Sequence, residues 1–125
     1  MKVCGRCGVA RPPEMYYTSG NAKWCRFCHR EYYQTRRAER QEYCDRVKVE
    51  SGCVDCGIRS PRPEIYDFDH VLPGKVKAVS AFLTSGTMED LMAEVARCEV
   101  VCANCHRIRT RDRGHPAFGT TRIAS

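Results

Sequence analysis

The clearest helical pattern lies at residues 88–97, where apolar side chains recur three or four positions apart. Thr87 precedes this stretch as a candidate N-cap, and Glu89 and Asp90 place negative charge in the first turn. We therefore predict a helix from Met88 to Arg97 with one buried face. That face would consist of Leu91, Met92, Val95 and Ala96.

Other short elements follow from local alternation and from turn residues. Residues 64–69 alternate between polar and apolar side chains and predict a strand. Residues 15–17 predict a shorter strand, and residues 79–83 predict a helical turn. A further short helix is expected to start near Asn104.

Residues 25–50 contain neither glycine nor proline and carry a dense mixture of both charges. Their apolar side chains are too sparse for the buried face of a helix. We predict one long, largely solvated helix with its charges paired on the surface; contact of its basic residues with nucleic acid is the alternative. Ser51 and Gly52 would end this helix.

The chain of 125 residues is long enough for one domain or for two very small ones. Its formal net charge of +6 suits a polyanionic partner such as DNA. Because no stretch approaches the ~20 apolar residues of a membrane span, we expect a soluble, cytoplasmic protein without a membrane partner. If a phage encodes the chain, that compartment is the host cytoplasm.

Ten cysteines dominate the candidate chemistry, and eight of them form four Cys-x-x-Cys pairs, which leaves Cys44 and Cys98 over. Disulfides are the competing interpretation, but the start of the chain has no apolar signal segment that would indicate secretion. Two thiolates two residues apart grip one zinc ion, and two such pairs complete its tetrahedron. We therefore predict two structural zinc sites, formed by Cys4, Cys7, Cys25 and Cys28 and by Cys53, Cys56, Cys102 and Cys105.

Both predicted zinc sites are closed, because four thiolates leave no open coordination position. His29 directly follows a cysteine of the first site, and we expect it on the helix surface rather than on the metal. The second site would join two pairs separated by 45 residues and would fix His106 beside the metal.

Three further residues have the chemistry of a hydrolytic centre. Asp69 and His106 can hold a divalent metal, whether Mg²⁺, Mn²⁺, Ni²⁺ or Zn²⁺, with positions left open for substrate. His70 ionises near neutrality and suits the base that activates water. Arg107 and Arg109 could contact flanking phosphates. Taken singly, His70 could be a packed or surface histidine, and His106 an accessory zinc ligand.

The segments that carry these residues resemble the HNH endonuclease family. The matching stretches are residues 53–57 (Cys-Val-Asp-Cys-Gly), 66–70 (Tyr-Asp-Phe-Asp-His) and 98–107 (Cys-Glu-Val-Val-Cys-Ala-Asn-Cys-His-Arg). The resemblance covers about residues 53–111 and implies a β-hairpin and helix around a metal, the ββα-metal finger. It implies Asp69 and His106 as metal ligands and His70 as the general base. The N-terminal unit looks like the zinc ribbon that precedes this nuclease in small phage and bacterial proteins, including recombination endonuclease VII-like ones.

One position departs from the family pattern. The family's central Asn usually lies a few residues before the third zinc cysteine, where residues 97–101 of this chain read Arg-Cys-Glu-Val-Val. The nearest Asn is Asn104, which suits a cap at the start of a helix.

These patterns predict a small zinc-stabilised α+β protein. It would comprise an N-terminal zinc ribbon (1–28), a connecting helix (29–52), an HNH nuclease domain (53–113) and a flexible tail (114–125). The expected activity is that of a metal-dependent DNA endonuclease or nickase. The alternatives are a non-catalytic zinc-stabilised DNA-binding or interaction module and a structure-specific nuclease on branched DNA. Besides DNA, the partners left open are a second copy of the chain and a phage DNA-processing protein.

Overall fold

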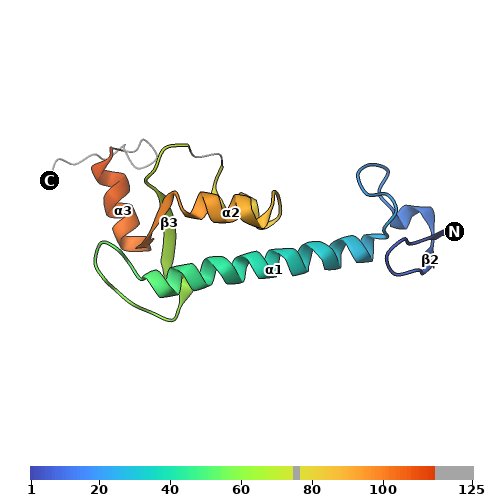
Figure 1. The fold of residues 1–125 in the computed structure, drawn as a ribbon, viewed down its shortest axis with the longest axis horizontal. Helices are drawn as coiled ribbons and strands as arrows, with labels where there is room; N and C mark the ends of the chain where they lie inside the picture. Colours follow the sequence, from blue (N-terminus) through green and yellow to red (C-terminus); the bar gives the residue numbers. More distant parts are fainter. Residues whose placement is uncertain (75–76, 115–125) are drawn as a thin grey trace. The chain divides into compact units, whose positions relative to one another are not determined.

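A computed structural model describes residues 1–74 and 77–114 (Figure 1). The chain divides into two compact units, Met1–Glu39 and the residues from Arg40 onward. Helix α1 (Arg26–Ser51) contributes its first half to one unit and its second half to the other. The tail expected at 114–125 lies outside the described residues except for Gly114. Every described helix is too short or too polar to span a lipid bilayer.

The N-terminal unit is built from a small antiparallel sheet and the start of α1. Strand β1 (Lys2–Val3) pairs with β2 (Ala10–Arg11), and a 3-10 turn, η1 (Pro13–Met15), follows. The prediction of a strand at residues 15–17 was wrong, because the prolines before Met15 favour a helical turn and only Tyr16 pairs in β fashion, with Cys25. The small core of this unit consists of Cys4, Tyr16, Cys25 and Cys28.

Helix α1 agrees with the predicted span but is not solvated along its whole length. Cys44 is 3% exposed and packs in the main apolar cluster of the second unit, with Val47 packed against it. Arg40 is 5% exposed, and its guanidinium donates to the carbonyls of residues 82, 85 and 86 at 2.6–2.8 Å. A sparse apolar pattern therefore concealed a packed half-helix, because one buried contact uses a charged residue that donates to three carbonyls.

His29 also departs from the surface position that we expected. Its ring is buried and contacts Tyr17 and Trp24, and Nε2 donates to the carbonyl of Asn21 at 2.6 Å. The histidine therefore packs beside the first cysteine cluster without belonging to it.

The second unit contains a second antiparallel sheet. Strand β3 (Tyr66–His70) pairs with β4 (Cys98–Cys102), with Tyr66 opposite Cys102 and His70 opposite Cys98. The strand begins two residues later than predicted, because a 3-10 turn, η2 (Pro63–Ile65), starts at a proline and precedes it. Helix α3 (Ala103–Asp112) leaves directly from the end of β4.

Two helical segments lie in the sequence between these strands. The predicted turn at residues 79–83 is a 3-10 helix, η3 (Val79–Leu83), and the predicted helix is α2 (Met88–Val95). Thr87 caps α2 as expected: its Oγ1 accepts the Asp90 amide proton at 3.1 Å, and the Asp90 carboxylate accepts from the Thr87 amide. These caps hold α2 at a defined start.

The buried face of α2 differs from the predicted stripe at three positions. Leu91 and Val95 are buried as expected, but Met92 and Ala96 are exposed. Glu94, only 1% exposed, takes their place on the inner face. A carboxylate in this position requires a polar partner, because an unpaired buried charge is costly.

Candidate metal centres and catalytic cleft

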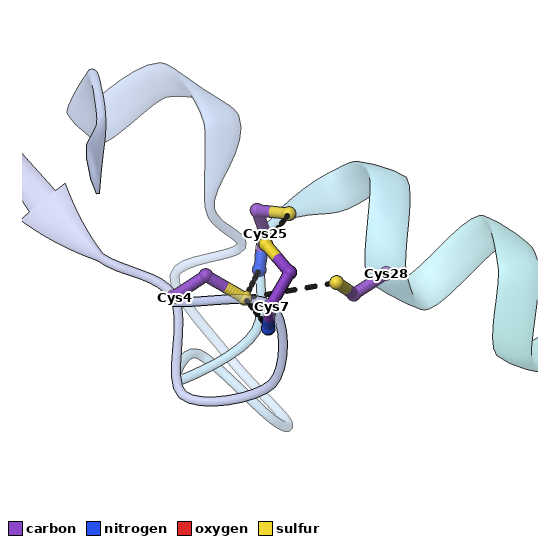
Figure 2. A group of neighbouring side chains, drawn as sticks. All are labelled: Cys4, Cys7, Cys25 and Cys28. Carbon is purple, nitrogen blue, oxygen red and sulfur yellow. Dashed lines mark hydrogen bonds between the residues drawn. The ribbon is translucent and has the colours of Figure 1, made fainter. Parts of the chain in front are cut away.

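The four cysteines of the first predicted zinc site gather between the β1–β2 turn and the start of α1 (Figure 2). The sulfurs of Cys4 and Cys28 are 3.7 Å apart, and those of Cys7 and Cys25 are 4.0 Å apart. Thiolates bound at about 2.3 Å to one tetrahedral zinc are separated by about 3.8 Å. The spacing therefore fits a zinc ion, and this cluster could hold one.

The backbone around Cys4 favours the thiolate form of this residue. Burial opposes ionisation of Cys4, but amide protons of Cys7, Cys25 and Arg6 point at its sulfur and lower its pKa to about 5. Since zinc binds the thiolate, this arrangement prepares a ligand before the ion arrives.

The second cluster repeats this chemistry with Cys53, Cys56, Cys102 and Cys105. The sulfurs of Cys56 and Cys102 are 3.9 Å apart, which again fits a shared zinc. Burial raises the pKa of Cys53, but amide donors led by Cys56 outweigh it and lower that pKa to about 6. Two four-cysteine clusters are thus present, as the sequence predicted, and none of the ten cysteines, all within the described residues, forms a disulfide.

The second cluster fixes the start of α3. The N-cap of this helix is Cys102, whose sulfur accepts the amide proton of Cys105 at 3.4 Å. Asn104 lies inside the first turn, so the expectation that it caps the helix was wrong. His106 follows Cys105 directly, and the cluster thereby holds His106 next to strand β3.

Asp69, His70 and His106 line one cleft of about 670 Å³ in the second unit. The first two come from the end of β3, and the third comes from the first turns of α3. The cleft also receives polar side chains from α1, β3 and α3, among them Lys48, Asp67, Thr110 and Arg113. Residues separated by 36 positions in the sequence therefore meet at one solvent-accessible surface.

His106 is oriented by the carboxylate of Asp67, which was not among the predicted site residues. Its Nδ1 lies 3.0 Å from Oδ2 of Asp67, and its Nε2 lies 3.6 Å from Oδ1 of Asp69. An Nδ1–H donated to Asp67 leaves the Nε2 lone pair facing Asp69, an arrangement typical of metal-binding histidines. The signal was available, because Asp67 and Asp69 are two apart on a strand and so lie on one face.

The spacing of His106 and Asp69 fits a shared divalent cation. Two ligand atoms at about 2.1 Å from one ion are separated by about 3–4 Å, depending on the angle between them. Within the described residues, larger groups of metal-ligating side chains occur only at the two cysteine clusters. A cation here would therefore have two protein ligands and open positions for water or phosphate.

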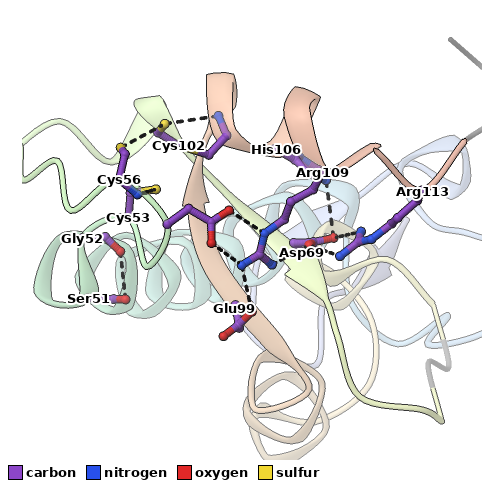
Figure 3. Close-up of polar contacts among 12 residues, drawn as sticks. Ser51, Gly52, Cys53, Cys56, Asp69, Glu99, Cys102, His106, Arg109 and Arg113 are labelled. Carbon is purple, nitrogen blue, oxygen red and sulfur yellow. Dashed lines mark hydrogen bonds and ion pairs between the residues drawn. The ribbon is translucent and has the colours of Figure 1, made fainter. Parts of the chain in front are cut away.

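Two arginines hold the Asp69 carboxylate (Figure 3). Arg113 donates to both carboxylate oxygens at 2.7–2.8 Å, and Arg109 donates to Oδ2 at 2.8 Å. Arg113 lowers the pKa of Asp69 most strongly; burial opposes the shift and Arg109 reinforces it, which brings the pKa to about 2. A cation at Oδ1 would share this oxygen with Arg113 or displace it.

His70 has a buried partner that the sequence did not reveal. Its Nε2 lies 3.0 Å from Oε1 of Glu94, and Arg97 lies 3.7 Å from the other oxygen of the same carboxylate. The donated Nε2–H fixes the imidazole and leaves Nδ1 as the nitrogen that can accept a proton. The available signal was an acidic residue aligned with Leu91 and Val95 on the inner face of α2.

The two arginines predicted to contact DNA differ in their surroundings. Arg107 is exposed. Arg109 is bound internally: besides Asp69, it makes a bidentate pair with Asp55 at 2.6–2.7 Å and contacts Glu99 at 3.0 Å. These hydrogen bonds, of which the one to Asp55 has the largest effect, raise the pKa of Arg109 above its ordinary value. Arg109 therefore ties α3 to the loop between Cys53 and Cys56 and to both strands.

Comparison of the chain with protein-family models, with curated proteins and with solved structures finds no match in any of the three.

Proposed function

We propose that the second unit is a metal-dependent DNA endonuclease of the HNH type, with β3, β4 and α3 forming its ββα-metal finger. The observation that carries the proposal is the meeting of Asp69, His70 and His106 in one cleft beside a four-cysteine cluster. Each side chain has a defined partner, so the three form an oriented set rather than a chance group of polar residues.

Asp69 and His106 would hold the divalent cation. A cation bound there supplies positive charge that stabilises the phosphate and the departing oxygen. Asp67 keeps the Nε2 of His106 free of a proton, and the buried carboxylate of Asp69 stays ionised at every physiological pH.

His70 would act as the general base. Its Nδ1 takes a proton from a water molecule while the water oxygen forms a bond to phosphorus. The bond from phosphorus to the departing sugar oxygen breaks, and that oxygen takes a proton from solvent. Glu94 accepts the Nε2–H of His70 and stabilises the imidazolium that results.

A non-catalytic DNA-binding module is the second candidate, and the ion pairs of Asp69 favour it. Both oxygens of this carboxylate are engaged by guanidinium groups, so cation binding requires Arg113 to move or to share Oδ1. Arg113 is about half exposed and lies at the C-terminal end of α3, where such a movement disturbs little else.

Supercoiled plasmid DNA separates the two candidates. Zinc-loaded protein is incubated with plasmid alone, with added Mg²⁺ and with added Mn²⁺, because a chelator would also extract the structural zinc. Nicked or linear product that depends on added metal supports the endonuclease. Plasmid that is retarded on a gel but intact in every arm supports the non-catalytic module.

A further inference from the structure

The N-terminal unit carries nearly all of the net positive charge. Residues 1–39 contain eight Lys and Arg against three Asp and Glu, a formal +5 of the +6 of the whole chain. Arg109 and Arg113, near the catalytic cleft, are by contrast paired with Asp55, Asp69 and Glu99. Attraction of a polyanion is therefore concentrated on the N-terminal unit.

The same unit exposes aromatic rings around a second cleft of about 540 Å³. Tyr17 and Tyr33 line it and remain 43% and 46% exposed. Two exposed ring faces that share a basic cleft are typical of sites that stack on nucleic acid bases.

A buried histidine forms the floor of this cleft, and two arginines line it. His29 is the floor of the cleft. Its ring centroid lies 5.0 Å from that of Tyr17 and 6.2 Å from that of Tyr33, and the rings of His29 and Tyr33 are stacked with 9° between their planes. Arg26 lies over the ring of Tyr17 at 4.3 Å, and Arg30 lines the same cleft. Because His29 is buried and bonded to a backbone carbonyl, the tyrosines pack on a rigid support.

We propose that this cleft binds single-stranded DNA, with unpaired bases stacked against both Tyr33 and Tyr17 and their phosphates on Arg26 and Arg30. The volume lies in the range of sites that hold a nucleotide-sized ligand. A duplex would satisfy the positive charge but hides the faces of its bases, so the exposed rings select an unpaired strand. The choice of DNA over RNA rests on the proposed function of the second unit.

Fluorescence anisotropy with the full zinc-loaded chain tests the proposal. The probes are a labelled oligo-dT of about 12 nucleotides, its RNA counterpart and a duplex of the same length, because other single-strand-binding domains cover about 4–16 nucleotides. No further divalent metal is added, and a denaturing gel establishes that each probe stays intact, so cleavage does not enter the measurement and a failure here is distinct from a failure of the nuclease proposal.

The single-stranded DNA is expected to bind more tightly than the duplex, and Tyr33→Ala and Tyr17→Ala are each expected to weaken it at least about fivefold. Tyr33→Phe should keep wild-type affinity, because the ring face remains. Arg30→Gln should lower the salt slope for the single strand by about 0.7. Phe27→Ala is the matched control, an exposed ring on the same helix outside the cleft.

Three results would overturn the proposal: tyrosine variants that bind like the wild type, a duplex that binds at least as tightly as the single strand, or RNA bound more tightly than DNA. Zinc content and circular dichroism of each variant establish that the unit is folded. The exposure of both tyrosines indicates that their removal leaves the core intact.

Discussion

Asp69 is the residue where folding and the proposed chemistry meet. Its pKa of about 2 lies below the ordinary 3.8, so ionised Asp69 stabilises the fold. The shift corresponds to about 2 kcal/mol, and Asp69→Asn should lower the free energy of unfolding by roughly that amount. Since the folded pKa is depressed, this stabilisation is fully present above the unfolded pKa and is lost as pH falls toward 2.

Urea unfolding of the zinc-loaded wild type and the Asp69→Asn variant at about pH 6 and pH 8 checks this prediction. The difference in stability should be the same at both values, because Asp69 is ionised in both states throughout this window. A difference that changes between them would assign the stabilisation to another titrating group.

Glu94 should affect the rate of cleavage without affecting the affinity for DNA. It contacts His70 from behind and is 1% exposed, so it positions the base and does not touch substrate. Glu94→Gln should lower kcat by about 10–100-fold, the usual cost of losing a partner that orients a functional histidine. The kinetic measurement should give an unchanged KM, and Glu89→Gln, an exposed acid on the same helix, should cleave normally.

At the scale of elements, the sequence located most helices and strands but not what their faces contact. Thr87 and Asp90 predicted the start of α2, and the alternation of polar and apolar side chains around Phe68 predicted β3. Periodicity assigns charged residues to the surface by default, so it misplaced Glu94 and Arg40, both buried with polar partners. Strand β4 carried no alternation and was implied only by the family resemblance.

Two arginines of helix α3 should have different roles, Arg107 in DNA binding and Arg109 in stability. Arg107→Gln should lower the salt slope of DNA binding by about 0.9, because Arg107 is exposed and free to approach a phosphate. Arg109→Gln should instead cost about 2 kcal/mol of stability, since it removes charged hydrogen bonds to Asp55 and Asp69. Binding isotherms over a range of salt, together with urea unfolding, separate the two effects; the reverse assignment would contradict the described contacts.

The whole molecule should bind two zinc ions per chain, one in each four-cysteine cluster. Each four-thiolate site can contribute about 10–16 kcal/mol of apparent folding free energy in a unit of this size. Elemental analysis should therefore find two zincs, and excess chelator should unfold both units. Cys105→Ser should lose one zinc, whereas Cys98→Ser should keep two, because Cys98 donates to a backbone carbonyl outside both clusters.

The cysteine clusters could be predicted because four pairs at fixed spacing allow few arrangements. The environment of the cleft could not, since it depends on contacts over long separations in the sequence. Arg113 reaches Asp69 across 44 positions, and Glu94 reaches His70 across 24. The sequence therefore supplied the candidate catalytic residues, and the structure supplied the partners that orient them.

The most direct test of the central claim compares plasmid cleavage by the wild type and by His70→Ala. Both proteins are zinc-loaded and assayed with the divalent metal that gives most product. The account predicts metal-dependent cleavage by the wild type and a rate at least about 100-fold lower for the variant, with zinc content and stability retained. Cleavage by the variant at the wild-type rate, or no cleavage by the wild type with any added metal, would contradict it.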